Sequence, residues 1–383
     1  MAQHAMQPEP GERLIQTRGA MDVQIRLFRD DETEAILELL LSSFGRWPGI
    51  PITVSPLDHL RWKLRLDESD ERRHRLAEFD GTRVGFIVHW TRPALLKGRP
   101  VLIADGSDIC VHPEFQGRGV MGALISSGEQ TRKVAVCYLE GSTHPAVLSK
   151  RHEAPEARGA FGNRVERFVR PMTLRSAFGA FRLYPGRSPR KLASSAQRFA
   201  GWLARRASGR TVAPGPSVRE VTVFDERTDG LWEEASRPFE FIMTRDRDYL
   251  SWRYADRRAG VFTILIAEDG ERLLGYTVLS VDRAGRRGAV ADVLVLPERV
   301  DAARALLREA VARMRRRGVE TIECWFPERH PCRSALEDAG FIMRRRKEVS
   351  AYRATGAVPE QDLAFIREPT SRVHLTLGDI DRV

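Results

Sequence analysis

A glycine-bearing loop between an expected strand and an expected helix is the stretch best suited to chemistry. Residues 109–125 read Ile-Cys-Val-His-Pro-Glu-Phe-Gln-Gly-Arg-Gly-Val-Met-Gly-Ala-Leu-Ile, and the apolar residues after Gly119 recur with helical period. Glycines remove Cβ atoms, so successive backbone N–H groups can close around an anion beside the positive end of the helix dipole. The stretch matches neither the P-loop pattern nor GxGxxG. It predicts a pyrophosphate cradle; a turn that only starts a helix is the alternative.

The elements that would position this loop occur twice in the chain. The segment Asp58-His-Leu-Arg-Trp-Lys63 returns as Asp248-Tyr-Leu-Ser-Trp-Arg253, at an offset of 190 residues. Two more pairs follow in the same order: Asp80-Gly with Val84-Gly-Phe86 against Asp269-Gly with Leu274-Gly-Tyr276, and Asp108-Ile-Cys-Val-His-Pro113 against Asp292-Val-Leu-Val-Leu-Pro297. The repeat predicts two halves built on one plan.

Each half is expected to be a mixed α/β sheet, because helical patterns separate the strand patterns. An Asp-Gly pair between apolar runs is typical of a hairpin turn. The expected strands are 23–28, 84–90, 101–111 and 134–140 in the first half, and 218–223, 262–267, 274–281, 289–296 and 321–325 in the second.

The loop resembles the coenzyme-A-binding motif of the GNAT superfamily of N-acyltransferases, a strand ending in Val-x-Pro followed by [Gln/Arg]-x-x-Gly-x-[Gly/Ala]. Gln116 and Gly119 match the first and fourth positions, and the sixth is Met121 instead of Gly or Ala. The resemblance extends over 22–172 and 217–350 and looks like the tandem-domain members. It implies two GNAT-like lobes, each a mixed twisted sheet flanked by helices. We place the lobes at 22–172 and 217–383, with a basic helical connector at 173–216.

The resemblance assigns acetyl-CoA, as co-substrate, to the first lobe. It implies that the backbone N–H groups of residues 117–122 bind the pyrophosphate and that the splayed strand at 109–111 hydrogen-bonds the pantetheine arm. The implied cofactor-binding residues are Ile109, Cys110, Val111, Gln116, Gly117, Arg118, Gly119, Val120, Met121 and Gly122. No metal is expected, because HxxxH and CxxC spacings are both absent.

Acyl transfer to an amine benefits from a base, because an ammonium of pKa about 10.4 is neutral in only about one molecule in two thousand at pH 7. In the implied fold, acceptor and thioester meet near residues 104–111 and 137–152. The candidate catalytic residues there are Glu140 and Asp105 as bases and Ser142 or Ser149 as acids. The serines are named because the Tyr that many family members use is absent from 142–158; departure of an unprotonated thiolate is the alternative. Glu323 stands in the place of Glu140 in the second half, which equally favours a structural role for Glu140.

The second half departs from the motif where phosphates would lie. After Pro297 comes Glu298-Arg-Val-Asp301-Ala-Ala-Arg304, without glycine and with two carboxylates. Each carboxylate would repel a phosphate by roughly a kcal/mol per screened contact, and side chains block the N–H groups. We expect a degenerate lobe that serves packing or shapes the acceptor site; coenzyme binding by another route is the alternative.

Nearly all of the net charge of +10 lies in one segment. Residues 171–210 contain nine Arg and Lys and no Asp or Glu. Within them, 189–209 is expected to form an amphipathic helix. Three roles are open to it: burying its apolar face between the lobes, which we favour, peripheral contact with an anionic membrane, or attraction of an acidic or nucleic acid partner.

Composition bounds the rest of the interpretation. At 383 residues, 42% of them hydrophobic, the chain is long enough for two cores. Residues 1–21 lack an apolar run and are expected to be a disordered leader, and no stretch is apolar enough to cross a bilayer. Four cysteines without a CxxC pair indicate a reducing, cytoplasmic compartment. Cys110 and Cys137 are expected to be buried strand residues.

We predict an acyl-CoA-dependent N-acyltransferase, in its simplest form an N-acetyltransferase, that moves the acyl group from acetyl-CoA to an amine of a small molecule or sugar by direct transfer. No nucleic acid partner is expected, and an electropositive cleft would steer an anionic acceptor. Trp90 and Trp325 are candidates to line that cleft, whereas the equivalent Trp62 and Trp252 are expected to pack. Two alternatives are a Fem-type aminoacyl-tRNA-dependent transferase and a non-catalytic CoA-binding sensor. Acyl chain length and oligomeric state are open.

Overall fold

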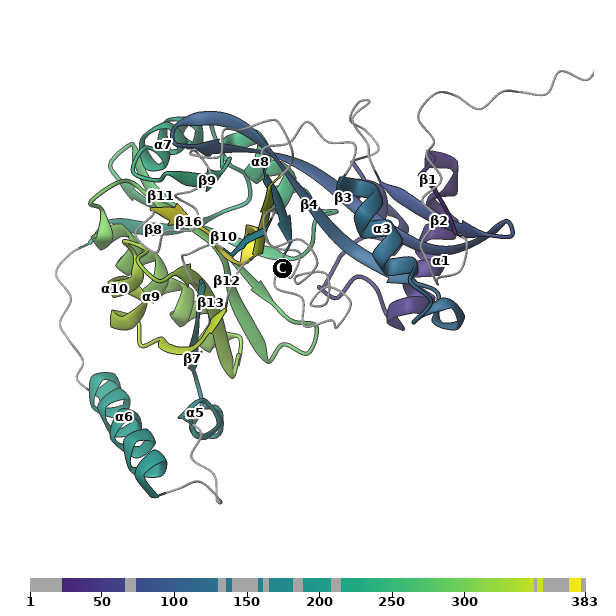
Figure 1. Ribbon diagram of the computed structural model, residues 1–383. Coiled ribbons are helices and arrows are strands. Elements are labelled where there is room, and N and C mark those ends of the chain that lie inside the picture. Colours follow the sequence, from purple (N-terminus) through teal and green to yellow (C-terminus); the bar gives the residue numbers. More distant parts are fainter. Residues whose placement is uncertain are drawn as a thin grey trace, which may run out of the picture.

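The protein folds into two α/β lobes, each built on a mixed sheet (Figure 1). The computed structural model describes residues 23–65, 74–129, 136–139, 158–160, 165–181, 189–207, 215–347, 350–353 and 372–379. The predicted two-lobed α/β fold is confirmed. The expected leader at 1–21 lies outside the described residues.

Both sheets have a parallel pair of strands flanked by antiparallel ones. The first runs in the order β1 (Gln24–Leu27), β2 (Arg75–Phe79), β3 (Thr82–Leu96), β4 (Arg99–Val111), β5 (Val136–Leu139), β15 (Ser350–Arg353) and β6 (Arg158–Ala160), with β9 (Phe241–Met243) on the end of β3 and β16 (Val373–His374) on β9. The second runs β14 (Ile342–Lys347), β7 (Val165–Pro171), β13 (Thr321–Pro327), β12 (Arg287–Val295), β11 (Arg272–Val281), β10 (Phe262–Asp269) and β8 (Ser217–Val221). These parallel pairs are β4 with β5 and β12 with β13, and β16 also runs parallel to β9.

The helices of the first lobe lie on both faces of its sheet. α1 (Thr33–Phe44) and α3 (Val120–Glu129) belong to separate cores, and neighbouring strand residues alternate between them, Phe86 in the core of α1 and Ile87 in the core of α3. The remaining described helices are α2 (Pro56–Lys63), α5 (Leu174–Phe181), α6 (Pro189–Ala207), α7 (Arg227–Ser236), α8 (Arg247–Leu250), α9 (Val300–Arg316) and α10 (Arg333–Asp338), with short turns η1 (Asp30–Glu32), η2 (Pro113–Phe115), η3 (Ser251–Ala255) and η5 (Leu377–Asp379).

The two sheets exchange one strand each. β7 follows β6 in the chain but pairs with β13 and β14, and β15 follows β14 but pairs with β5 and β6. The exchange is reciprocal, because each strand lies in the same place, between the last two strands of the other sheet. The expected lobe limits, 22–172 and 217–383, follow chain order and place both strands with the wrong sheet. A repeat in sequence does not tell which of two equivalent gaps a strand fills.

Equivalent tryptophans of the repeat meet where the lobes join. The rings of Trp62 and Trp252 stack, with centroids 5.1 Å apart and planes 25° apart. The indole N–H of Trp62 donates to the carbonyl of Trp252 at 3.1 Å. This contact between equivalent residues, together with the reciprocal exchange of β7 and β15, indicates that an approximate two-fold axis relates the lobes. The packing role expected for these residues is confirmed.

Each lobe also extends a hairpin towards the other. The outer part of the β3–β4 hairpin crosses to the second lobe, where residues 94–96 pair with β9 (Figure 1). In return Arg283, in the β11–β12 turn, donates to the carbonyls of Pro48 and Ile50 at 2.9 and 3.0 Å. The lobes are thus joined by backbone pairing as well as by side chains.

The expected connector helix forms, and it lies beside a shorter helix. Phe199 of α6 packs on α5, its ring 5.7 Å from Phe178 and 5.5 Å from Phe181. The two helices project from the second lobe (Figure 1). The expectation that the apolar face of α6 is buried between the lobes is therefore wrong for Phe199. Among the described helices, none is both long and apolar enough to cross a bilayer.

Candidate active site

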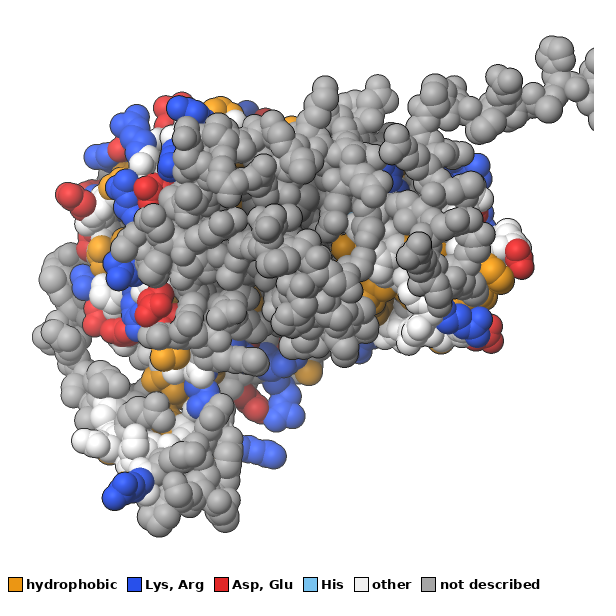
Figure 2. Space-filling model, in the orientation of Figure 1, with side chains coloured by type: hydrophobic (Ala, Val, Ile, Leu, Met, Phe, Trp, Pro, Cys, Tyr) orange, Lys and Arg blue, Asp and Glu red, His pale blue; other side chains and the backbone are white. Residues whose placement is uncertain are grey.

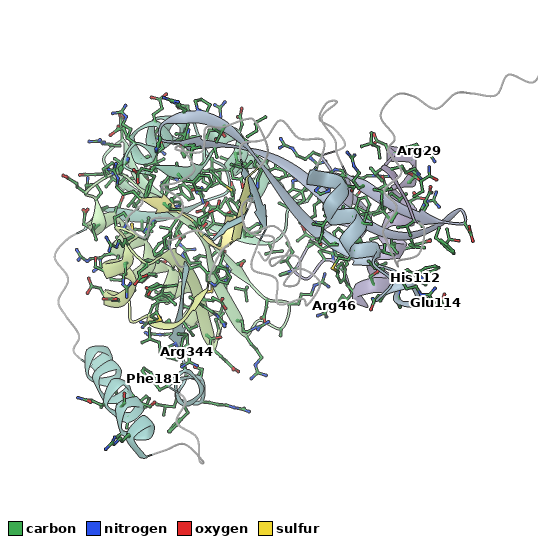
Figure 3. All side chains as sticks on the ribbon, viewed as in Figure 1. Arg29, Arg46, His112, Glu114, Phe181 and Arg344 are labelled. Carbon is green, nitrogen blue, oxygen red and sulfur yellow. The ribbon has the colours of Figure 1, made fainter. Side chains whose placement is uncertain are left out.

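The loop between β4 and α3 is an open cradle of backbone. After the η2 turn, Gly117 and Gly119 have φ of 77° and 87°, a region that residues with a Cβ rarely adopt. α3 starts directly after Gly119, and the first N–H groups of a helix have no partner within it. A Cβ at Gly117 would meet nothing within 4 Å. Open space beside positively polarised N–H groups suits a pyrophosphate. His112 and Glu114, on this loop, are labelled in Figure 3.

Hydrogen bonds hold the loop to the strands and to α1. The His112 N–H donates to the carbonyl of Val84 at 2.9 Å. The side-chain amide of Gln116 and the hydroxyl of Ser43 both donate to the carbonyl of Val111, each at 3.2 Å. Gln116 thus ties the loop to the end of β4; direct contact with a coenzyme stays a prediction for this residue.

Gly85 sets how closely α3 approaches the sheet. A Cβ on Gly85 would lie 2.8 Å from Val120 and 3.0 Å from Leu124, both on α3. Its repeat partner Gly275 is as crowded, since a Cβ there would lie 2.6 Å from the carbonyl of Leu294. The absence of a side chain at Gly85 therefore positions the start of α3, where the cradle lies.

Within the described residues, β4 separates from its neighbour β5 after Asp105, before it reaches the loop. The described pairs between them end at Asp105 with Tyr138, whereas β4 continues to Val111. Around Asp108, whose φ is 45°, the register with β3 shifts, which bends the strand. Residues 109–111, predicted to bind the pantetheine arm, lie in this diverging part.

The diverging part of β4 is buttressed by a buried ion pair. Lys63 Nζ lies 2.7 Å from a carboxylate oxygen of Asp108, and the two side chains are 6% and 11% exposed. Cys110 is buried beside them. Burial, with a smaller effect of Asp108, raises the pKa of the Cys110 thiol to about 12. Cys110 is therefore a protonated strand residue at neutral pH, as expected.

Of the four candidate catalytic residues, only Asp105 falls within the described part of the chain. Its backbone lies at the last β4–β5 pair, where the two strands diverge. Glu140, Ser142 and Ser149 lie outside the described residues. Their assignments stay predictions.

The second-half counterpart of Glu140 has a structural role. Glu323 accepts hydrogen bonds from Arg167 and from the indole N–H of Trp325, each at 2.6 Å. Trp325 is only 2% exposed and belongs to the second core, so it does not line a cleft as suggested from the sequence. The side chain of Trp90 is not among those the structure describes.

The described residues at the start of α9, in the second lobe, form no glycine cradle. α9 begins at Val300, three residues after Pro297, whereas α3 begins at Val120, seven residues after Pro113. Asp301 lies in the first turn of α9, held by Arg299 at 2.8 Å. The N–H groups of Ala302 and Ala303 donate to the carbonyl of Arg299. The chain's own acceptors thus occupy the helix start. That this lobe binds no coenzyme stays a prediction.

Side chains of the second lobe also fill the region where β12 diverges from β13. The described pairs end at Ala289, although β12 reaches Val295. Beside this end of β12, a hydrogen bond of 2.9 Å joins Nε2 of His330 to Nδ1 of His374. Burial lowers the pKa of both imidazoles, so both are neutral at pH 7. The cavity next to them is about 40 Å³, too small for a pantetheine arm.

A buried charge network fixes the segment 372–379 against both lobes. Arg245, 1% exposed, lies 3.1 Å from Asp292 and 2.6 Å from Asp379. Burial alone would raise the pKa of Asp292, but Arg245 and His374 hold it well below its usual range. Arg92 of β3 donates to the carbonyl of Asp379 at 2.7 Å. Asp292, the counterpart of Asp108, is therefore structural.

A cavity of about 530 Å³ is lined by residues of both halves of the chain. Residues 49–51 come from the first half, Ser176, Gly179 and Ala180 from α5, and most of the rest from the second sheet. Its charged side chains are Arg167, Arg287, Arg344, Asp282 and Glu323. Four of these form ion pairs, Arg167 with Glu323 at 2.6 Å and Arg287 with Asp282 at 3.2 Å. Arg344, labelled in Figure 3, also lines the cavity.

Two lobes with mixed sheets and diverging parallel strands, of which the first carries a glycine cradle, define the class of two-lobed N-acyltransferases. The model of the acetyltransferase (GNAT) family matches residues 33–138 and 228–341, which together are more than half of the chain. The chain belongs to this family, in its tandem arrangement. Among curated proteins no match was found.

Solved structures share this fold at low sequence identity. A probable N-acyltransferase from Enterococcus faecalis V583 is 12% identical, with a TM-score of 0.59 over 87% of this chain and 73% of that one. An N-myristoyltransferase from Saccharomyces cerevisiae with bound myristoyl-CoA is 13% identical, with a TM-score of 0.56 over 95% and 86%. A GCN5-related N-acetyltransferase from Anabaena variabilis ATCC 29413 is 10% identical, with a TM-score of 0.55 over 86% and 72%.

Proposed function

We propose that the chain transfers the acyl group of acetyl-CoA to an amine of a small molecule or sugar. The observation that carries this proposal is the cradle at 116–119, placed between the diverging end of β4 and the start of α3. A thioester supplies an already activated acyl group. The protein then has to bind the coenzyme, align the amine and take up its proton.

Direct transfer fits the chemistry of the described residues. A relay through a covalent enzyme intermediate needs an activated nucleophile, and Cys110 is buried with its pKa raised to about 12. We propose Asp105 or Glu140 as the base and Ser142 or Ser149 as the acid. Asp105 is favoured by its position where β4 and β5 diverge.

The 530 Å³ cavity is the proposed acceptor site. Its size suits a small molecule, and both halves of the chain line it. We propose that the guanidinium of Arg344, which lines this cavity, binds an anionic group that the acceptor carries besides its amine. Three buried free cysteines, Cys110, Cys324 and Cys332, agree with action in the reducing cytoplasm.

Calorimetric titration with coenzyme A, followed by a thiol-release assay with a panel of amines, tests the proposal. We expect saturable 1:1 binding, because only the first lobe has a cradle, and turnover with at least one amine. The acyl donors should run from acetyl to myristoyl, since the yeast relative is described with bound myristoyl-CoA.

The outcomes separate the alternatives. An Arg344→Gln variant should raise KM for acidic acceptors several-fold and leave it unchanged for neutral ones, while Arg315→Gln, an exposed change on α9, should alter neither. Failure to bind coenzyme A contradicts the proposal. Binding without turnover for any donor and amine favours a CoA-sensing protein instead.

A further inference from the structure

The α5–α6 pair exposes apolar side chains to solvent, and no described residue covers them. Leu174 is 63% exposed, Phe178 49% and Leu203 44%. Leu174 and Phe178 are one turn apart on α5, Phe178 contacts Phe199, and Leu203 is one turn from Phe199 on α6. These side chains therefore form one patch across two helices, which we call the hairpin patch (Leu174, Phe178 and Leu203).

The segment that carries the hairpin patch is basic in sequence. The segment 171–210, which contains both helices, has nine Arg and Lys and no Asp or Glu. Arg175 and Arg190 are exposed in the described part. Figure 2 shows blue Lys and Arg side chains where the pair leaves the body of the molecule. A patch that is both apolar and purely basic needs a partner that is both apolar and acidic.

We propose that the α5–α6 pair docks on the surface of an anionic lipid bilayer. Leu174, Phe178 and Leu203 would enter the boundary between headgroups and acyl chains, and the basic residues would face anionic headgroups. A nucleic acid would satisfy the charges but leave the apolar side chains exposed. A second copy of the chain would cover the apolar side chains but bring two sets of like charges together. The bilayer satisfies both features.

The location of the pair gives this docking a consequence for the cavity. Ser176, Gly179 and Ala180 of α5 line the 530 Å³ cavity. Arg344, which also lines the cavity, donates to the carbonyl of Gly179 at 3.5 Å. Docking through α5 would therefore hold the cavity next to the membrane surface.

Flotation of the full chain with vesicles tests the docking without reference to acyl transfer. The protein should float with vesicles of phosphatidylglycerol and phosphatidylcholine at 0.1 M salt. With vesicles of phosphatidylcholine alone, the amount of protein that floats should be at least tenfold lower. Raising the salt to 0.5 M should weaken binding, because it screens the headgroup charge. An Arg175→Glu/Arg190→Glu variant should weaken it about fivefold or more per charge.

Apolar variants separate insertion from simple charge attraction. Leu174→Ser/Leu203→Ser, which changes no charge, should lower binding at least tenfold, whereas Leu27→Ser/Val223→Ser, which changes side chains 53% and 65% exposed outside the pair, should bind like the wild type. Equal melting temperatures of the four proteins establish that each is folded. Absence of flotation, equal binding to neutral vesicles, binding of duplex DNA or RNA instead of vesicles, or dimerisation through the hairpin patch would each overturn the proposal.

Discussion

At the scale of single residues, the lobes differ in whether the helix start faces open space or bonds to the chain's own acceptors. In the first lobe Gly117 lies beside open space, and Gly119 shares its positive φ at the start of α3. Asp301 and the carbonyl of Arg299 engage the equivalent helix start in the second. A change that fills the cradle should therefore act on coenzyme binding alone.

We expect Gly117→Glu to lower the affinity for coenzyme A by roughly 100-fold, because its carboxylate would occupy and repel the pyrophosphate position. The change also forces a side chain into positive φ, at about 1 kcal/mol. Gly318→Glu controls for this strain, since Gly318 has φ of 73° and an equally open surrounding after α9. Titration calorimetry should show an affinity within twofold of wild type for the control. Equal losses in both variants would contradict the cradle.

At the scale of elements, the seating of α3 on β3 links packing to binding. Gly85→Ala and Gly275→Ala each introduce a crowded methyl group, and each should lower the free energy of unfolding by about 1–3 kcal/mol. Gly85→Ala alone displaces the start of α3, so it alone should weaken coenzyme binding, by about tenfold. Urea denaturation and calorimetry measure the two effects. An unchanged affinity in Gly85→Ala would show that coenzyme binding does not depend on the position of α3.

The sequence is informative wherever the determinants of an element are local. Strands β1, β4 and β10–β13 and helix α6 lie close to their expected limits, because apolar runs between turn residues report burial of the segment itself. β3 was expected to end at Trp90 and continues to Leu96, because its last residues pair with β9 from the other half. In the second hairpin the turn is Gly270–Glu271 and not Asp269–Gly270, since Asp269 pairs with Arg272.

In the candidate site, too, only the locally determined features could be predicted from the sequence. The glycines of the cradle were recognisable, because their type alone permits the backbone they adopt. The Lys63–Asp108 pair, the engagement of Glu323 by Arg167 and the His330–His374 contact join residues between 44 and 156 positions apart. Local spacing carries no record of such partners, so these contacts could not be predicted from one sequence.

At the scale of the whole molecule, the reciprocal exchange of β7 and β15 makes each sheet dependent on both halves. Proteins with separate domains often unfold in more than one step. Here calorimetry should show a single unfolding transition, because neither sheet keeps all its strands if the other unfolds. Residues 1–172 expressed alone should not fold cooperatively, since that fragment lacks β15 and leaves β7 without β13 and β14. Two resolved transitions, or a folded fragment, would contradict this coupling.

The strand exchange also bears on how the chain is made. Ser350, where β15 begins, is translated 190 residues after Ala160, where β6 ends. At synthesis rates of 5–20 residues per second that interval lasts about 10–40 s. Throughout it the nascent first half carries two strand edges, on β5 and β6, whose partner has not yet been synthesised. The cradle-bearing sheet is thus completed only after the ribosome has made nearly all of the lobe that has no cradle, and the growing polypeptide is a natural client for chaperones until then.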